Sequence, residues 1–291
     1  MKTEQGKHHV VVVGAGPVGL LTAYLLRRMQ VDVTLLERRH SRSTQSKASS
    51  MNAYSLAIMD MVGLADAFIE QGMPIHDLLV YWNNRRTMHV NYRHLPSVHD
   101  YILGISQPET EAVLEHAYRD LGGSLQRGSS VTALTPTEQG VEVELDDGRI
   151  LSSDYVVGCD GSLSTVRTLM GIEFEGSDFG VEFFMFDAQV SWAGEVGKVH
   201  YYVREDSFFL IIPRPAVPTG SSSRPATARL PRCRAILWRS TRNSPTATVV
   251  VGSSWSASSG SPILASTTGW RVATRKAGCS CAETPATCSV R

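Results

Sequence analysis

The sequence predicts an α/β protein in which a parallel sheet with helices is joined to a second, mainly antiparallel β-sheet. Three observations support this prediction. The β-branched run His9–Val13 leads through a glycine-rich turn into an apolar helical segment and a second strand at residues 31–37. Aromatic, partly alternating runs at 181–190 and 199–212 indicate further strands. The last part of the chain, residues 216–291, lacks periodicity and predicts a disordered or aberrant C-terminal tail.

Local composition and the positions of Gly and Pro predict three helical segments. Residues 18–29 are rich in Leu and Ala and suit a buried helix, and residues 52–71 predict one or two helices broken at Gly63. Pro108 fits the first helical position, where its missing N–H has no intrahelical role. The acidic residues that follow it stabilise a helix start, so we expect a helix from Pro108 to Asp120.

Short apolar runs separated by turn residues predict the remaining strands of the first 160 residues. They lie within 75–90, 131–134, 141–145 and 155–159. An Asp-Asp-Gly turn at 146–148 indicates that the middle two belong to an antiparallel ribbon. A short helix is expected after the last of them, from about Ser164 to Met170.

The net charge of zero is a cancellation between two parts of the chain. Before residue 216 there are 18 Lys and Arg against 27 Asp and Glu, and in the last 76 residues there are 10 against 1. Four of the five cysteines also lie in this tail, without a spacing typical of a zinc site, so no metal is expected. With 291 residues the chain can build a core without disulfide or metal cross-links.

Residues 10–26 contain no charge and could be mistaken for a signal peptide or a membrane span. Gly14, Gly16, Pro17 and Gly19 interrupt this stretch and argue against both interpretations. We therefore expect a cytoplasmic protein without a membrane partner, in a thiol-reducing setting.

The segment Gly14-Ala15-Gly16-Pro17-Val18-Gly19 has the spacing of a dinucleotide-binding fingerprint between a strand and a helix. Gly14 permits the tight turn, Gly16 lets the backbone approach a pyrophosphate, and Gly19 lets the helix pack on the strand. Glu37 lies eighteen residues after Gly19, where an acid accepts hydrogen bonds from ribose hydroxyls. This Rossmann-like unit therefore predicts a tightly held FAD or NAD rather than NADP.

With these motifs, residues 8 to about 213 resemble the FAD-dependent aromatic hydroxylases, the p-hydroxybenzoate hydroxylase-like group A flavoprotein monooxygenases, especially the phenol and polyketide hydroxylases. Cys159-Asp160-Gly161-Ser162-Leu163-Ser164-Thr165-Val166-Arg167 is similar to the family's second motif, whose Asp lies near the FAD and the transient nicotinamide site. The resemblance also implies FAD contacts at Arg38, Lys47 and Gln107. Ser49 stands where the family often has an arginine close to the flavin.

The resemblance implies a discontinuous FAD-binding domain, residues 1–72 with 98–172, and a substrate-binding sheet, residues 73–97 with 173–215. It also implies a reaction in which NAD(P)H reduces FAD and a flavin C4a-hydroperoxide, formed with O2, hydroxylates a phenolic or polyketide-like aromatic substrate. The choice between NADH and NADPH, the substrate and the oligomeric state stay open. No catalytic residue is assigned, and the possible phenol partners are His76, His89, His94, His99, Tyr81, Tyr92, Tyr201 and Tyr202.

Residues 216–291 form a low-complexity basic tail, and the family's third motif, typically Gly-Arg-Val-x-Leu-x-Gly-Asp-Ala-x-His, is missing from it. In the family its Asp meets the ribityl and pyrophosphate region of FAD. Reading the codons of residues 276–291 from the third base of each permits Gly-Arg-Val-Phe-Leu-Cys-Gly-Asp-Ala-Gly-His-Val-Phe-Ser-Pro. The hypothesis is a frameshift near codons 213–217, which would leave a truncated, inactive chain. The alternative is a natural disordered tail.

Two other functions stay open at this point. A flavoenzyme of the same build, such as a halogenase or a ring-cleaving monooxygenase, would give a halide-dependent or ring-opened product. A non-catalytic protein whose basic tail binds nucleic acid would show an affinity that falls steeply with salt. The basic residues of the tail are scattered, so no nucleic-acid partner is expected.

Overall fold

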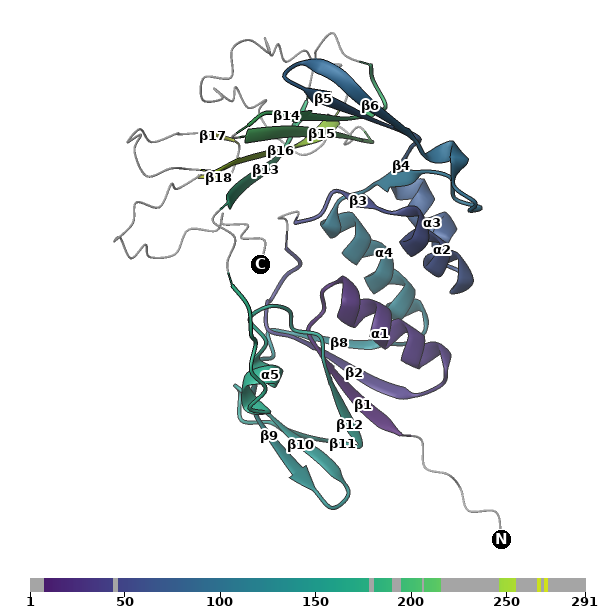
Figure 1. Cartoon of the computed structure of the whole chain (residues 1–291). Coiled ribbons are helices and arrows are strands. Elements are labelled where there is room, and N and C mark those ends of the chain that lie inside the picture. The colour runs from purple at the N-terminus through teal and green to yellow at the C-terminus, as the bar shows by residue number, and fades with distance from the viewer. Residues whose placement is uncertain are drawn as a thin grey trace. The chain divides into compact units, whose positions relative to one another are not determined.

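The structure is a computed structural model that describes residues 8–43, 47–177, 181–189, 195–205, 207–215, 246–254, 266–267 and 270–271. Contacts divide the chain into two compact units, residues 1–45 with 107–177 and residues 46–106 with 178–291 (Figure 1). Residues 46–72 and 98–106, which the resemblance placed in the FAD-binding domain, lie in the second unit of this division. The first unit contains the glycine fingerprint.

The first unit is built on a four-stranded parallel sheet. Its strands lie in the order β12 (Tyr155–Gly158), β1 (His9–Val13), β2 (Asp32–Glu37) and β8 (Ser124–Arg127). Because all four run in the same direction, their carboxyl ends meet at one edge. The strand order reverses at β1, and this is the place where open α/β sheets bind ligands.

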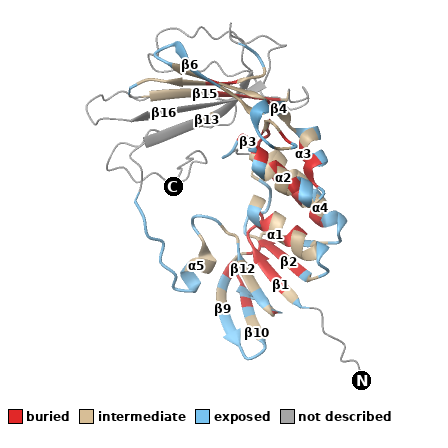
Figure 2. Ribbon diagram, turned by 45° about the vertical axis from the view of Figure 1, so that its right-hand side comes forward, coloured by how far each residue is buried: buried red, intermediate tan, exposed pale blue. Residues whose placement is uncertain are grey.

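Two helices, α1 (Pro17–Arg28) and α4 (Gln107–Asp120), pack against each other in this unit. An antiparallel sheet of β9 (Val131–Thr137), β10 (Gly140–Leu145) and β11 (Ile150–Ser153) covers the parallel sheet. Its valines and leucines share one core with Val11, Val13 and Leu36 of β1 and the neighbouring β2. Figure 2 shows this concentration of buried residues in β1 and β2.

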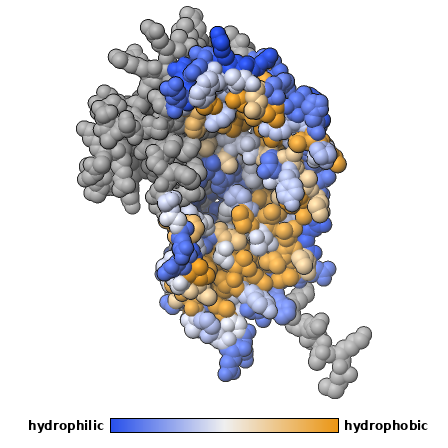
Figure 3. Space-filling view, viewed as in Figure 1, coloured by the Kyte–Doolittle hydropathy of each residue, from blue (hydrophilic) through white to orange (hydrophobic). Residues whose placement is uncertain are grey.

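Hydrophobic side chains gather on the face of the first unit that carries α1 (Figure 3). Two of the exposed residues on or beside this helix are Val18 and Met29, at 67% and 73% exposure. The first-unit helix α5 (Thr165–Leu169) follows β12. None of the helices in the described part of the chain is long and apolar enough to cross a membrane.

The second unit begins with short elements. Strand β3 (Ser50–Met51) pairs with β7 (Ile102–Gly104), which also pairs with β4 (Met73–Ile75). Helices α2 (Ala53–Met61) and α3 (Ala65–Gln71) lie between β3 and β4 in the chain. Gly63 separates the two helices with a φ of 75°, so the predicted break at this glycine is confirmed.

A six-stranded sheet dominates the second unit. Its order is β13 (Val181–Gln189), β16 (Thr246–Ser254), β15 (Ser207–Arg214), β14 (Val199–Val203), β5 (Asp77–Trp82) and β6 (Arg85–Asn91). All neighbours are antiparallel except β14 and β5, which confirms the mainly antiparallel second sheet. Asn83 and Asn84 both have positive φ and form the tight turn between β5 and β6, and the 3-10 helix η1 (Tyr92–His94) follows β6.

Strand β16 corrects one expectation. Residues 246–254 were predicted as part of a structureless tail, but they form a strand paired on both sides, with β13 and β15. Five of the six residues in the run Thr-Ala-Thr-Val-Val-Val are β-branched and suit a pleated sheet, a local signal that the average composition of 76 residues conceals. Two further short strands in the tail, β17 (Ser266–Thr267) and β18 (Trp270–Arg271), pair with each other, and the rest of the tail lies outside the described residues.

Candidate functional site

The turn between β1 and α1 requires glycine at two positions. Gly14 has a φ of 100°, and a Cβ atom there would lie 2.6 Å from the carbonyl oxygen of Cys159. A Cβ atom on Gly19 would overlap the carbonyl oxygen of Gly14. The backbone of this turn therefore packs against the turn after β12 and against its own helix. The two sequence motifs, about 145 residues apart, meet at the carboxyl edge of the sheet.

The N-terminus of α1 is open. Gly16 is its N-cap residue, no side chain caps the helix, and its first turn contains no acidic residue. A Cβ atom built on Gly16 would have no atom within 4 Å. The first N–H groups and the positive end of the helix dipole thus border free space, which fits a pyrophosphate group. On this observation the residues present fit the dinucleotide that the fingerprint implies.

Glu37, the last residue of β2, reaches the fingerprint turn. Its Oε2 accepts a hydrogen bond of 2.8 Å from the amide of Ala15, and its Oε1 accepts one of 3.0 Å from the amide of Arg39. Each carboxylate oxygen has a second lone pair, which leaves acceptor capacity for ribose hydroxyls. Arg38, the next residue, is exposed.

Asp160 has a structural role that the sequence reasoning missed. Its carboxylate accepts hydrogen bonds from the Ser164 hydroxyl at 2.5 Å and from the amides of Thr165 and Val166 at 2.6 and 3.1 Å. These amides belong to the first turn of α5, so the carboxylate caps this helix. The neighbouring Gly161 has a φ of 83°, and a Cβ atom there would meet no atom within 4 Å. The sequence signal for the capping role of Asp160 was the Asp-x-x-x-Ser spacing before a helical segment.

Gln107 is the first residue of α4 and donates a hydrogen bond of 2.8 Å from Nε2 to Oε1 of Glu111. Glu111 is buried, with 4% exposure. Burial raises the pKa of the Glu111 carboxyl, and the hydrogen bond from Gln107 and the positive charge of Arg39 oppose this rise. The resemblance implied Gln107 as a candidate but not Glu111, although their spacing of four residues places both on one helix face.

Lys47 is the one candidate cofactor residue in the second unit, and it is exposed. The nearby Ser49 is buried, and its hydroxyl donates to the Met185 sulfur at 3.4 Å within the same unit. All other candidate cofactor residues lie in the first unit, where the fingerprint, Glu37 and Asp160 meet at one sheet edge.

Several possible phenol partners have protein contacts. His89 lies 2.7 Å from the Asp77 carboxylate, and this hydrogen bond lowers the pKa of Asp77. Tyr81 and Tyr202 stack with ring centroids 4.4 Å apart, and burial raises the pKa of Tyr202. These side chains belong to β5, β6 and β14, so the six-stranded sheet presents an aromatic and polar surface.

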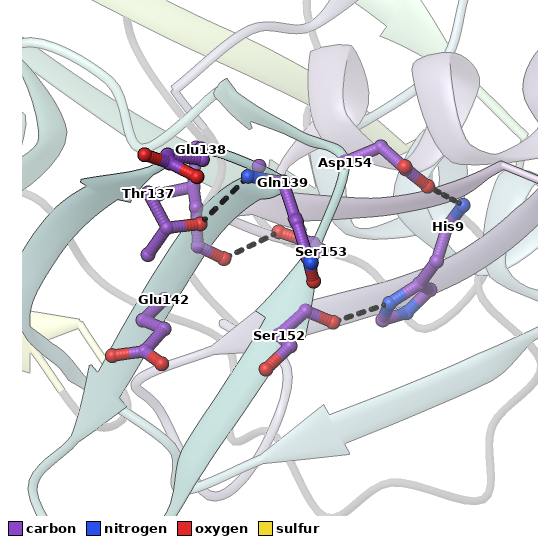
Figure 4. A pocket seen from close by; sticks show the side chains of 10 residues that line it. His9, Thr137, Glu138, Gln139, Glu142, Ser152, Ser153 and Asp154 are labelled. Atoms are coloured by element: carbon purple, nitrogen blue, oxygen red, sulfur yellow. Dashed lines mark hydrogen bonds between the residues drawn. The ribbon is translucent and has the colours of Figure 1, made fainter.

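A pocket of about 440 Å³ lies at the other end of the first unit (Figure 4). It is lined by polar groups of β9, β10 and β11 and by His9, which begins β1. The Asp154 carboxylate accepts a hydrogen bond of 2.6 Å from the His9 amide, which lowers the pKa of Asp154. Because His9 marks the amino end of the parallel sheet, this pocket lies opposite the edge where the fingerprint turn is found, and we assign it no part in nucleotide binding.

Comparison with known proteins agrees with this geometry. Rifampicin monooxygenase from Streptomyces venezuelae is 35% identical over 192 residues, which cover 64% of this chain and 38% of that protein. Pentachlorophenol 4-monooxygenase from Sphingobium chlorophenolicum is 29% identical over 223 residues, covering 71% of this chain and 40% of that protein. The chain thus spans well under half the length of these curated relatives.

A solved structure shares the fold. Pseudomonas aeruginosa PqsL in complex with 2-aminobenzoylacetate aligns with a TM-score of 0.70 at 18% identity, covering 86% of this chain and 61% of PqsL. The family described as FAD binding domain matches residues 7–259, which extends beyond Pro213 and includes β16. The chain therefore belongs to the FAD binding domain family, whose nucleotide is FAD.

Proposed function

We propose that this chain is the cofactor-binding and substrate-sheet part of an FAD-dependent monooxygenase. The substrate is an aromatic compound, phenolic or polyketide-like, and the co-substrates are NAD(P)H and O2. The observation that carries the proposal is the close packing of Gly14 against Cys159, which brings both flavoprotein motifs to one sheet edge. The relatives named as monooxygenases of rifampicin and pentachlorophenol support the reaction class.

The chain's own residues have distinct parts in this proposal. The open N-terminus of α1, with Ala15, Gly16 and Pro17, holds the pyrophosphate, and Glu37 accepts hydrogen bonds from the adenosine ribose. When bound, FAD supplies the redox chemistry that takes electrons from NAD(P)H and lets one atom of O2 enter the aromatic ring. Asp160 holds the start of α5 and the Gly161 turn in place beside this edge.

The remaining candidates, Arg38, Lys47 and Gln107, are proposed as FAD contacts on the resemblance. Gln107 is the best supported by geometry, because its amide group is oriented by the buried Glu111. The exposed Arg38 and Lys47 are available to a negatively charged cofactor.

The six-stranded sheet supports an aromatic substrate. Tyr202 and Tyr81 are register partners and therefore share one face, while Tyr201 lies on the other face with its partner Leu210. The Tyr201 ring meets Phe208 edge-on, with centroids 5.5 Å apart. Both faces thus offer aromatic rings against which a planar substrate can pack.

The test is a titration of the purified chain with FAD, followed by incubation with NADH or NADPH, O2 and phenolic substrates. We expect bound flavin and, if residues 216–291 are the natural tail, a product that is one oxygen atom heavier; under the frameshift hypothesis the chain as written gives no product. A product that requires halide would instead indicate a halogenase, and a product with an opened ring would indicate a ring-cleaving monooxygenase. Salt-sensitive nucleic-acid binding with no flavin binding would favour the non-catalytic alternative.

The frameshift hypothesis is tested by repeating these assays on a second chain. In that chain one base is inserted near codons 213–217, which restores the shifted frame. We expect FAD to bind more tightly to the restored chain, since it regains the third motif. Equal affinity of both chains would contradict the hypothesis that the missing motif weakens the FAD site.

A further inference from the structure

Helix α4 begins at the same sheet edge as the glycine fingerprint. Residues 121–123 lead from α4 into β8, whose first residue, Ser124, pairs with Thr34 near the start of β2. The end of α4 thus lies toward the amino edge of the parallel sheet, and its first residue, Gln107, lies toward the carboxyl edge. Helices α1 and α4 lie side by side, and α1 also starts at this edge (Figure 1). The topology of the first unit therefore places Gln107 on the side of the nucleotide fingerprint.

Glu111, one turn further along α4, places a carboxyl group in the protein interior. It is only 4% exposed, and its Oε1 accepts the hydrogen bond of 2.8 Å from Nε2 of Gln107. Burying a carboxyl group costs free energy that an apolar residue at this helix position would not cost. Such costly polar groups within otherwise regular elements are found mainly at functional sites.

The charged groups around Glu111 come from several elements. Burial is the largest influence on its carboxyl group and raises the pKa. Arg39, two residues after β2, and Arg127, the last residue of β8, lower this pKa, whereas Glu37 raises it. On α4 itself the next carboxylate, Glu115, is bonded to Arg127 at 2.6 Å, and α1 has no charged residue in its first ten positions. Glu111 therefore ionises above its ordinary pKa of 4.5, under the influence of two arginines that favour the ionised form.

The ionisation state of Glu111 decides how the carboxamide of Gln107 is turned. An ionised carboxylate only accepts hydrogen bonds, and in a glutamine side chain only the nitrogen donates. The 2.8 Å contact therefore fixes Nε2 toward Glu111 and Oε1 away from it. A protonated carboxyl group both donates and accepts, so it would allow either orientation of the amide.

We propose that Glu111 is a positioning residue of the FAD site, whose ionised carboxylate holds the Gln107 carboxamide with its oxygen presented to a hydroxyl group of the cofactor. Glu111 has this part only if the chain binds FAD as proposed above. Phosphate oxygens only accept hydrogen bonds, so an amide oxygen does not suit them and suits the ribityl or ribose hydroxyls instead. Glu111 is buried and acts on the cofactor through Gln107. The stability lost by burying the carboxylate is the cost of holding one orientation of the amide.

The test is a double-mutant cycle on FAD affinity at pH 8, measured with the full chain by quenching of flavin fluorescence. Glu111→Gln can donate as well as accept, so both orientations of Gln107 become available. An equal mixture alone would lower the affinity about twofold, and the weaker bond to a neutral acceptor should bring the loss to about threefold or more. In the Gln107→Ala background the same change should alter the affinity by less than about twofold. Asp120→Asn removes a negative charge at the exposed end of α4 and is the control, without effect on FAD.

The pH dependence separates positioning from a structural role. A protonated Glu111 has the donor and acceptor capacity of Gln, so the ratio of parent to Glu111→Gln affinity should approach one as the pH falls toward 4.5. Groups outside the pair titrate in both proteins and cancel in this ratio. FAD-free Glu111→Gln should be no less stable than the parent at pH 8, so its weaker FAD binding is not a loss of folding. If this variant does not fold, the ratio of parent to Gln107→Ala affinity across the same pH range tests the same step.

Each contrary result has a distinct meaning. Equal FAD affinity of the parent and Glu111→Gln, or a ratio that does not change with pH, would overturn the positioning role and leave the proposed function intact. An effect of Glu111→Gln that is equally large in the Gln107→Ala background would also overturn it, because Glu111 would then act without Gln107. No FAD binding by the parent would reject the proposed function, and the positioning role with it.

Discussion

Glu37 accepts a hydrogen bond of 2.8 Å from the amide of Ala15, so the end of β2 is tied to the turn that follows β1. The two residues are 22 positions apart, and the bond joins the acidic and the glycine-rich parts of the fingerprint. The carboxylate thereby lies at the same sheet edge as the open N-terminus of α1.

Replacing Glu37 with Gln should weaken FAD binding about tenfold, roughly 1.4 kcal/mol, because hydrogen bonds to a charged acceptor are stronger than those to a neutral amide. Quenching of flavin fluorescence measures this affinity. Asp32→Asn, at the exposed opposite end of β2, is the matched control and should not change it. If the Glu37 variant and the parent bind FAD with equal affinity, Glu37 does not contribute to the cofactor site.

Gly16→Asp should separate folding from cofactor binding. Asp is favoured at a helix N-cap, and the space beside Gly16 is open, so the free energy of unfolding should stay equal or rise by roughly a few tenths of a kcal/mol. The new carboxylate would repel a pyrophosphate, and FAD affinity should fall more than a hundredfold. Denaturant unfolding and flavin titration are the two measurements, and retained FAD binding would contradict the proposed pyrophosphate position.

Gly14→Ala should destabilise the fold. Gly14 has a positive φ, and the added Cβ would meet the backbone of Cys159. We expect a loss of about 2 kcal/mol or more in the free energy of unfolding of the FAD-free protein. Gly148→Ala, also at positive φ but with no atom within 4 Å of the added Cβ, is the matched control for the backbone cost alone. Similar losses at both positions would show that the contact with Cys159 is not tight.

Asp160→Ala should destabilise the protein even without FAD. Its carboxylate accepts the amides of Thr165 and Val166, and the loss of a helix cap costs about 1 kcal/mol, up to about 2. Asp160→Asn keeps one acceptor oxygen and should cost less. Denaturant unfolding of the FAD-free variants measures these changes. An unaltered FAD-free stability would mean that Asp160 serves the cofactor rather than helix α5.

Glu111→Gln should stabilise the protein at neutral pH. Burial raises the pKa of Glu111 above its ordinary value of 4.5, so the stability that this group contributes is complete below pH 4.5 and is lost as the pH rises through the raised pKa. The variant cannot ionise and should be more stable than the parent at pH 7 to 8, with a gap that closes as the pH falls toward 4.5. Unfolding curves across this range measure the gap, with the exposed Glu138→Gln as control. A variant that is less stable than the parent at pH 8 would contradict this assignment.

Much of the first unit could be predicted from the sequence because its signals are local. The strand at His9–Val13, the glycine turn and the helix starting near Pro108 depend on neighbouring residues, and the structure confirms them within one or two positions. The shared edge of the two motifs follows from the parallel order of the strands.

The rest depends on contacts between distant segments. Composition alone could not show that Thr246–Ser254 would pair with β13 and β15. Nor could it show that 46–72 would join the second unit, since unit membership depends on packing over the whole chain.

The nucleotide fingerprint could be identified from the sequence by itself. It consists of glycines at fixed spacing in one turn and an acid at the end of the next strand, and both are local features of the chain. Only the tertiary structure decided which polar side chains are buried and which of them join distant elements. Glu37 bonds to Ala15, 22 positions away, and Glu111 is buried at 4% exposure, whereas Asp160 and Gln107 bond to partners within six positions. The physical reason is that burial and the bond from Glu37 depend on elements far apart in the chain, which meet only when the sheet is assembled.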